Sequence, residues 1–297
     1  MTCDDVETVK PRVAAVVVTY HPDEDVQMHL AALQPQVDQL IVVDNGSSDA
    51  AVEKLRRQGE ELGFELIANG ENLGVATALN RGAQRALETC AEWIFFFDQD
   101  SCVTDGFTAK MLAGYDSVAA RRPLGILVPR YVDRQSGNPH PVMRLSDGSL
   151  ITAITSGSLM RAGTFRELGS FADELFIDSV DHEYSFRVRR SGRILAECES
   201  AVLFHSLGMP KPHSLLGVFR FQSTNHSPVR RYYQERNKIW MYRHYGLAFP
   251  AFFAREFLRS FVDLAKLELV EREKWAKTKA FFRGVADGLR NRMGRCL

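Results

Sequence analysis

The chain has few cysteines, and their spacing suggests no pairing. The five are Cys3, Cys90, Cys102, Cys198 and Cys296, an odd number without a C-x-x-C pair. We therefore expect neither a disulfide framework nor a structural zinc site, and a reducing compartment suits the sequence. A chain of 297 residues can bury enough surface to fold without such links.

The sequence also lacks a signal for export or for a membrane span. Its first ten residues, MTCDDVETVK, are acidic where a secretory signal is basic and then apolar. The apolar run GLAFPAFFA is much shorter than the roughly 20 residues that a spanning helix needs, and Pro250 interrupts it. We therefore expect a cytoplasmic protein without a transmembrane segment.

A net charge of zero conceals an uneven distribution. Residues 228–297 hold 16 basic and 7 acidic side chains, so this part carries +9 and the rest of the chain −9. The acidic part and the basic part are expected to have different partners.

Strands and helices alternate over the first hundred residues. Predicted strands at 13–20, within 40–49, at 64–69 and at 93–100 alternate with helical stretches. Continuous apolarity is typical of strands covered on both faces, and the alternation predicts βαβ units in a mostly parallel sheet. Ligands bind at the carboxyl ends of such strands, where Asp44, Asn45, Asp98 and Asp100 stand.

The rest of the chain is less regular until its last part. We expect short strands at 125–132, 154–160 and 194–206, and an acidic loop that leads into an amphipathic helix within 173–192. From Pro228 onward the pattern is helical, with Phe253, Phe257 and Phe261 at helical spacing.

The strongest chemical signal is FFFDQDS, which contains Asp98 and Asp100. With 18 Asp in the chain, about one D-x-D is expected by chance, and Asp23-x-Asp25 in a polar stretch is read as solvated. Asp98 and Asp100 differ because a buried strand precedes them and no Lys or Arg neighbours them. Such carboxylates are costly unless they hold a hard cation, for which Mg²⁺ or Mn²⁺ is the expectation.

Two further features carry candidate groups. FIDSVDHEYSFR places Asp178, Asp181 and Glu183 near a loop-to-helix junction, where one aspartate can act as a general base or all can simply favour the helix dipole. His205 ends an apolar strand in FHSLG, where it is either a structural histidine or a metal ligand.

Three interpretations of these groups are open. FFFDQDS matches the start of haloacid-dehalogenase-type phosphatases, in which the first Asp is the nucleophile, but βα structure precedes it here. A nucleotide-binding or sugar-binding module without catalysis is the second interpretation. A transferase that uses a metal to hold a diphosphate leaving group is the third, and it alone uses all the acidic groups.

Seven motifs in order resemble the inverting glycosyltransferases of family 2, and within them the bacterial rhamnosyltransferases that make O-antigen, capsule or rhamnolipid. They are VVVTYHP, VDNGSSD, ENLGVATALNRG, FFFDQDS, FIDSVDHEYSFR, FHSLG and RRYYQERN, which together cover about residues 12–240. The resemblance implies an α/β protein with a GT-A fold, in which a Rossmann-like, mostly parallel sheet is flanked by helices.

The resemblance also implies a division of the chain. Residues 1–227 would form the catalytic domain, with a nucleotide-sugar-binding part at about 12–104 and an acceptor part at about 105–227. Residues 228–297 would form a basic helical extension.

Carried over position by position, the resemblance assigns roles to individual residues. Asp44 would bind the nucleotide base, Asp100 the metal, and Asp181 would be the catalytic base with Asp178 as the alternative. Asp98 would serve both donor and metal, and His205 would be a further metal ligand. The other donor-binding candidates are Thr19, Tyr20, Asn72, Gly74, Asn80, Gln99, Arg231 and Arg236. For the two arginines and Asn237, a role in the core or at an interface is the alternative.

The implied reaction is one displacement that inverts the sugar. Asp181 would take a proton from an acceptor hydroxyl, while a divalent cation, Mg²⁺ or Mn²⁺, neutralises the leaving diphosphate. The donor implied is dTDP-L-rhamnose, and the acceptor is a cell-surface glycan or a lipid-linked molecule. Another nucleotide sugar is the alternative donor.

The basic part at 228–297 leaves its partner open. Its apolar stripe and positive charge suit peripheral binding at the inner face of the cytoplasmic membrane. Packing on the catalytic domain or formation of a homodimer is the alternative. We do not expect nucleic acid, because the catalytic face is acidic and the aromatic residues follow core spacing.

Overall fold

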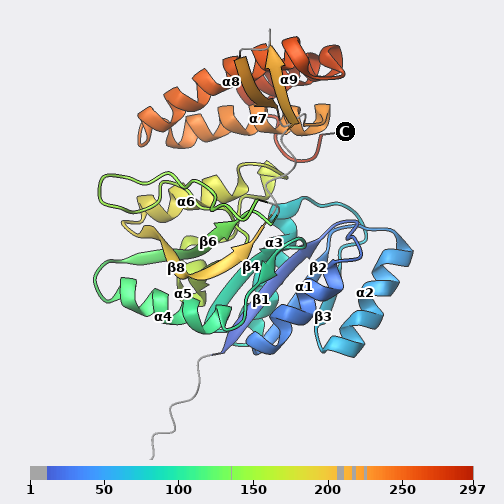
Figure 1. The fold of residues 1–297 in the computed structure, drawn as a ribbon, viewed down its shortest axis with the longest axis vertical. Helices are drawn as coiled ribbons and strands as arrows, with labels where there is room; N and C mark the ends of the chain where they lie inside the picture. Colours follow the sequence, from blue (N-terminus) through green and yellow to red (C-terminus); the bar gives the residue numbers. More distant parts are fainter. Residues whose placement is uncertain (1–11, 135, 206–210, 216–218, 224–225, 297) are drawn as a thin grey trace, which may run out of the picture.

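The computed structural model describes residues 12–134, 136–205, 211–215, 219–223 and 226–296 (Figure 1). Cys3 and the SLG part of the FHSLG motif lie outside the described residues. Cys90, Cys102 and Cys198 are free thiols, in agreement with the sequence. None of the described helices is both long and apolar enough to cross a membrane.

The first half of the sheet forms as the alternating pattern predicts. The strands pair in parallel in the order β3-β2-β1-β4. They are β1 (Val13–Thr19), β2 (Gln39–Asp44), β3 (Glu65–Ala68) and β4 (Trp93–Asp98). The helices between them are α1 (Val26–Leu33), α2 (Asp49–Leu62) and α3 (Val75–Glu88), and a 3₁₀ turn covers Gln34–Gln36. Every residue of β1 is buried, as expected for a strand covered on both faces.

The second half extends this sheet to eight strands in the order β3-β2-β1-β4-β7-β6-β8-β5. Within the described part of this sheet, the antiparallel pairings are those of β7 with β4 and β6 and that of β5 with β8. These strands are β5 (Cys102–Val103), β6 (Leu124–Val132), β7 (Ser158–Arg161) and β8 (Ile194–Phe204). The helices are α4 (Phe107–Ala119), α5 (Ala162–Leu168) and α6 (Val180–Arg190), with a 3₁₀ turn at Asp173–Leu175. The expected α/β fold with a mostly parallel sheet is confirmed.

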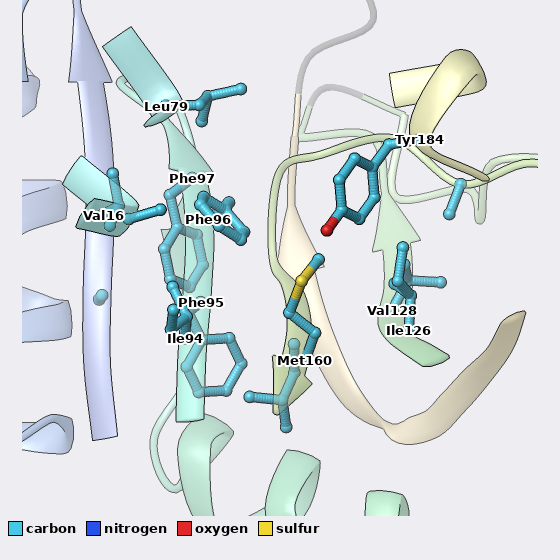
Figure 2. Close-up of a cluster of buried hydrophobic side chains, with 14 of the residues drawn as sticks. Val16, Leu79, Ile94, Phe95, Phe96, Phe97, Ile126, Val128, Met160 and Tyr184 are labelled. Carbon is cyan, nitrogen blue, oxygen red and sulfur yellow. The ribbon is translucent and has the colours of Figure 1, made fainter. Parts of the chain in front are cut away.

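The core lies between β4 and the elements on both of its sides. Figure 2 shows Phe95, Phe96 and Phe97 between Val16 on one side and Met160 on the other. Phe95, Phe96 and Val16 are fully buried. On α3, Gly82 allows close packing, because a Cβ there would lie 2.2 Å from Val16 Cγ1. This packing fixes the strand that ends at Asp98.

Three helices at the C-terminal end form a layer above the eight-stranded sheet (Figure 1). They are α7 (Pro228–Tyr245), α8 (Pro250–Val270) and α9 (Lys274–Leu289). The helical prediction from Pro228 onward is confirmed, whereas the division into domains at 227/228 stays a prediction. A hairpin of β9 (Lys211–Leu215) and β10 (Phe219–Ser223) was not expected.

One helix of this layer holds the loop between the 3₁₀ turn and α6. Phe176, Asp178 and Ser179 have φ angles of 64°, 62° and 66°, a left-handed conformation that costs free energy in residues other than glycine. Asn237 of α7 lies against this loop, and its Nδ2 is 2.9 Å from Leu175 O and 2.8 Å from both Ile177 O and Asp178 O. The same loop carries Asp178 and leads directly into Asp181, so α7 positions both carboxylates.

Replacing Asn237 by the apolar Leu should therefore destabilise the protein. Asn237→Leu leaves Ile177 O and Asp178 O without their donor, whereas Leu175 O keeps its hydrogen bond from Arg236. We expect the free energy of unfolding to fall by about 2 kcal/mol or more. Urea unfolding followed by circular dichroism measures this change. Val229→Ala, at an exposed site in the same helix, is the control. A loss below about 0.5 kcal/mol for Asn237→Leu, typical of surface substitutions, would contradict the role of this side chain.

Candidate active site

Three potential metal ligands meet at the carboxyl end of the sheet. Asp98, Asp100 and His205 each offer one ligand atom, and these atoms all lie within 4.8 Å of one another. Asp98 ends β4, and His205 follows β8 directly. Pairing of Cys102 in β5 with Phe204 in β8 brings the two segments together. A histidine far from the D-x-D in sequence is thereby placed beside it.

The atoms in this group have unmet bonding capacity. Asp100 Oδ1 and His205 Nδ1 are buried, and neither has a hydrogen-bond partner among the described residues. They lie 3.4 Å apart. Leaving buried polar atoms unpaired is costly. Carboxylate oxygens and an imidazole nitrogen are suitable ligands for a divalent cation such as Mn²⁺, so the residues fit the expected metal.

The protonation of the group reflects its burial and its crowded charges. Burial is the main cause that raises the pKa of Asp98 to about 6; the neighbouring carboxylates of Asp100 and Asp181 contribute to the rise, and His205 and Arg230 oppose it. Burial would lower the pKa of His205, but Asp100 and Asp98 outweigh it, and the net change is upward. The arrangement therefore favours added positive charge, whether as a proton or as a cation.

A second pair of carboxylates lies next to this group. Asp181 is in the first turn of α6, and its Oδ1 accepts a hydrogen bond of 2.8 Å from the backbone N–H of His182. Burial raises the pKa of Asp178. The positive charge of Arg230 opposes this rise, and the negative charge of Asp181 adds to it. Because Asp181 also acts on the pKa of Asp98, the two acidic sets form one electrostatic cluster.

Arg230 is the basic residue that faces this cluster. Its Nη2 and Nε both lie 3.2 Å from Asp178 Oδ1, and its charge also lowers the pKa of Asp98. The side chain is half exposed, so it can reach a ligand. The sequence analysis did not single out Arg230, although it stands seven residues before Asn237 in α7 and so shares its helical face.

The two arginines that the sequence analysis chose are buried in structural contacts instead. Arg231 is 6% exposed, and its Nη2 lies 3.1 Å from Glu271 Oε1. Arg236 is 1% exposed and donates to Leu175 O at 3.0 Å and Glu174 O at 3.2 Å. The structure therefore favours the core role that was the alternative for both, because neither guanidinium faces the acidic cluster.

Serine and tyrosine side chains form hydrogen bonds next to the potential metal ligand Asp98. The backbone N–H of Asp98 donates to Ser156 Oγ at 3.2 Å, and Ser101 and Ser156 form a short hydroxyl contact. Tyr131 Oη donates to Ser156 O at 2.8 Å. Burial raises the pKa of Tyr131 well above its usual range, so this hydroxyl stays protonated as a donor.

Asp44 and Thr19 lie beneath the loop that follows β2. Both are fully buried, and Thr19 Oγ1 donates to Asp44 Oδ2 at 3.1 Å. Asp44 Oδ1 accepts from the backbone N–H groups of Gly46 and Ser47 at 3.1 and 2.9 Å. In this arrangement Asp44 shapes the loop, and its predicted contact with a base stays a prediction.

Tyr20 and Gln99 connect the ends of β1 and β4. The backbone N–H of Tyr20 donates to Gln99 Oε1 at 2.7 Å, and Tyr20 as a residue is 46% exposed. An exposed aromatic residue at the carboxyl end of the sheet is available for contact with a ligand.

The motif ENLGVATALN packs against the loop at 171–176. Asn80 Nδ2 donates to Phe171 O at 2.9 Å, and Asn80 Oδ1 accepts from Phe171 N at 2.8 Å. Asn72 Oδ1 accepts from Gly74 N at 3.0 Å. Gly74 has a φ of 92°, and a Cβ there would lie 2.7 Å from Phe176 O, so the motif requires glycine. Asn80 thus links α3 to the segment that precedes the 3₁₀ turn at Asp173–Leu175.

The comparisons with known proteins agree with this geometry. The model of the family "Glycosyl transferase family 2" matches residues 15–166, which is more than half of the 297 residues. The chain is 28% identical to the dTDP-rhamnosyl transferase RfbF of Shigella flexneri over 94% of this chain and 96% of that protein.

Solved structures share the fold at low sequence identity. TarS 1–349 of S. aureus in complex with UDP-GlcNAc aligns with a TM-score of 0.62 at 15% identity, over 92% of this chain and 81% of that one. The mannosyltransferase PcManGT of Pyrobaculum calidifontis, in complex with GDP-Man and Mn²⁺, aligns with a TM-score of 0.55 at 17% identity, over 95% and 76%. The family match and these neighbours lead to one conclusion: the chain belongs to glycosyltransferase family 2 and has its GT-A fold.

Proposed function

We propose that the protein is an inverting, metal-dependent rhamnosyltransferase. It transfers L-rhamnose from dTDP-L-rhamnose to a hydroxyl of a cell-surface glycan or of a lipid-linked acceptor. The observation that carries the transfer chemistry is the group of Asp98, Asp100 and His205 beside Asp181. The choice of donor is supported by the similarity to RfbF over nearly the whole of both chains.

Asp98, Asp100 and His205 would hold Mg²⁺ or Mn²⁺. The bound cation would neutralise the charge that develops on the diphosphate as the sugar leaves. PcManGT, with the same fold, has Mn²⁺ and GDP-Man in its structure, which supports a divalent ion here. Without a cation, the carboxylates of Asp98 and Asp100 would repel the diphosphate of the donor. The donor therefore needs the positive charge of the cation.

Asp181 is the better candidate for the catalytic base. Asp178 already forms an ion pair with Arg230, whereas Asp181 is held by a single backbone N–H. The first turn of α6 places this carboxylate beside the three potential metal ligands. Asp181 can therefore accept the proton of the acceptor hydroxyl as that oxygen attacks the anomeric carbon. A single displacement inverts the configuration at this carbon.

Arg230 would bind the diphosphate of the donor, in place of Arg231 and Arg236. Its half-exposed guanidinium lies at the edge of the acidic cluster, and arginine forms bidentate hydrogen bonds with phosphate oxygens. Thr19, Tyr20, Asp44, Asn72, Gly74 and Gln99 remain the proposed walls of the nucleotide pocket. In this division, residues 12–104 hold the nucleotide and residues 105–227 the acceptor.

Other donors and other classes of protein are less well supported. TarS and PcManGT share the fold while their structures contain UDP-GlcNAc and GDP-Man, so another nucleotide sugar is the alternative donor. A phosphatase of the haloacid-dehalogenase type does not agree with membership in family 2. If the protein only bound a nucleotide or a sugar, without catalysis, Asp181 would have no role.

We further propose that the enzyme is cytoplasmic and binds peripherally to the inner face of the cytoplasmic membrane through residues 228–297. The net charge of +9 in these residues supports attraction to anionic lipids. A homodimer through the same residues is the alternative, and no nucleic-acid partner is proposed.

Asp181→Asn should abolish turnover while donor binding is kept. Asparagine preserves the size of the side chain but cannot take a proton, and general base catalysis typically contributes about 10²- to 10⁴-fold. Release of dTDP from dTDP-L-rhamnose measures turnover, and calorimetry measures donor binding. If Asp178→Asn abolishes turnover and Asp181→Asn does not, then Asp178 is the base.

Asp100→Ala should weaken Mn²⁺ binding by about tenfold or more, because it removes a direct ligand from a group of three. Mn²⁺ titration followed by electron paramagnetic resonance measures the affinity. Asp23→Ala is the matched control, since Asp23 belongs to the other D-x-D and is exposed. Equal Mn²⁺ affinity in Asp100→Ala and Asp23→Ala would rule out the ligand role of Asp100.

Arg230→Gln should weaken donor binding about tenfold, or about 1.4 kcal/mol, because it removes a charged contact to the diphosphate. Calorimetry with dTDP-L-rhamnose and Mg²⁺ measures the change, with Arg57→Gln at an exposed position of α2 as control. By contrast, Arg231→Gln should lower stability, because it breaks a buried ion pair with Glu271. An unchanged donor affinity in Arg230→Gln would argue against a diphosphate contact.

A further inference from the structure

The helices α8 and α9 form the outer layer of the C-terminal helices. Three sides of α7 have different partners. Asn237 faces the loop between the 3₁₀ turn and α6. Glu235 and Lys238 contact Ser260 of α8, and Tyr232 Oη donates to Asp287 of α9 at 3.0 Å. The start of α8 also contacts α6, where Phe252 and Phe253 pack against Phe186. The rest of α8 and α9 lie on the side of α7 that faces away from the sheet (Figure 1).

The exposed side of α8 is apolar. Leu258, Phe261, Val262 and Leu269 are 66%, 69%, 46% and 58% exposed. Their spacing of three, four and seven residues places them on one face of the helix. This face is separate from the buried side, where Phe253, Ser260 and Leu267 recur every seven residues.

The exposed side of α9 repeats this pattern. Trp275, Phe282 and Leu289 are 81%, 57% and 58% exposed. They stand seven residues apart, so they share one face with a drift of only about 20° per step. The opposite side is tightly packed, because a Cβ at Gly284 would lie 2.3 Å from Tyr232 O of α7. We call the exposed apolar residues of α8 and α9 together the outer face.

Basic side chains accompany the outer face. Those exposed on or next to the two helices are Arg255, Arg259, Arg272, Lys274, Lys279, Arg283 and Arg290. The exposed acidic side chains there are Glu268 and Glu273. Positive charge therefore exceeds negative charge around the apolar residues. Aromatic and aliphatic side chains bordered by Lys and Arg are typical of helices that lie in a membrane interface.

We propose that the outer face binds the surface of a bilayer that contains anionic lipids, with Trp275, Phe282 and Phe261 inserted among the headgroups. This deepens the peripheral binding in the proposed function by naming the surface, the inserted residues and the lipid charge. A second copy of the chain fits less well, because pairing this face with itself brings like charges together. An anionic bilayer supplies the opposite charge.

Fluorescence of Trp275 provides a direct test with the full-length protein. The chain has three tryptophans, of which Trp93 and Trp240 are 5% and 7% exposed and Trp275 is 81% exposed. Titration with phosphatidylcholine vesicles containing phosphatidylglycerol should shift the emission to shorter wavelength. Vesicles of phosphatidylcholine alone should give a much smaller shift, and high salt should weaken the binding to anionic vesicles.

Two variants separate the apolar contribution from folding and from transfer. The double variant Phe261→Ser/Phe282→Ser should lose at least tenfold in vesicle affinity, with unchanged circular dichroism and unchanged dTDP release. Met28→Ser, at a 50% exposed apolar position of α1 outside this layer, should bind vesicles as the unmodified protein does.

Three outcomes would overturn the proposal. They are no emission shift with anionic vesicles at low salt, full vesicle binding by the double variant, and a dimeric mass by light scattering that the double variant reduces to a monomer. Vesicle binding is measured without substrate. If the protein releases dTDP normally but does not bind vesicles, only the proposal that the outer face binds a membrane is rejected. If the unmodified protein binds anionic vesicles but releases no dTDP from dTDP-L-rhamnose, only the proposed transferase function is rejected.

Discussion

Repulsion among carboxylates at the carboxyl end of the sheet is the constraint on which the rest of the site depends. Asp98 and Asp100 follow a buried strand, and the first turn of α6 brings Asp181 close enough to act on the pKa of Asp98. His205 and Arg230 supply part of the compensating charge. Asp100 Oδ1 and His205 Nδ1 are buried and 3.4 Å apart, and neither makes a hydrogen bond among the described residues, which indicates where a cation would be accommodated. A divalent cation would supply the rest of the compensating charge and would also offset the negative charge of a donor's diphosphate.

The C-terminal helices are part of this arrangement rather than an independent addition. Asn237 of α7 binds the carbonyls of the left-handed loop, and Arg230 of the same helix pairs with Asp178 of that loop. Tyr245 near the end of α7 donates to Glu183 of α6 at 2.6 Å. The layer that we propose to contact lipid is thus linked through one helix to the proposed catalytic base.

Some of these features could be predicted from the sequence because they depend on local patterns, whereas others depend on contacts between distant segments. Buried strands were recognisable because continuous apolarity is a local property, and so was the D-x-D after FFF. The approach of His205 to Asp100 depends on the pairing of β5 with β8, a contact between distant segments that no local pattern encodes; only the family resemblance suggested it. Arg230 was missed although its helical phase with Asn237 was visible. The β9–β10 hairpin was missed because Pro212 within its first strand weakens the strand signal.

The central claim is that the acidic group binds a cation and, with it, a nucleotide sugar. Thermal unfolding across a panel of nucleotide sugars, each with Mg²⁺, with Mn²⁺ and with chelator, tests this most directly. The account predicts that dTDP-L-rhamnose raises the unfolding temperature more than the other donors do, and that chelator removes this effect. Equal protection with chelator, or no protection by any nucleotide sugar, would contradict it.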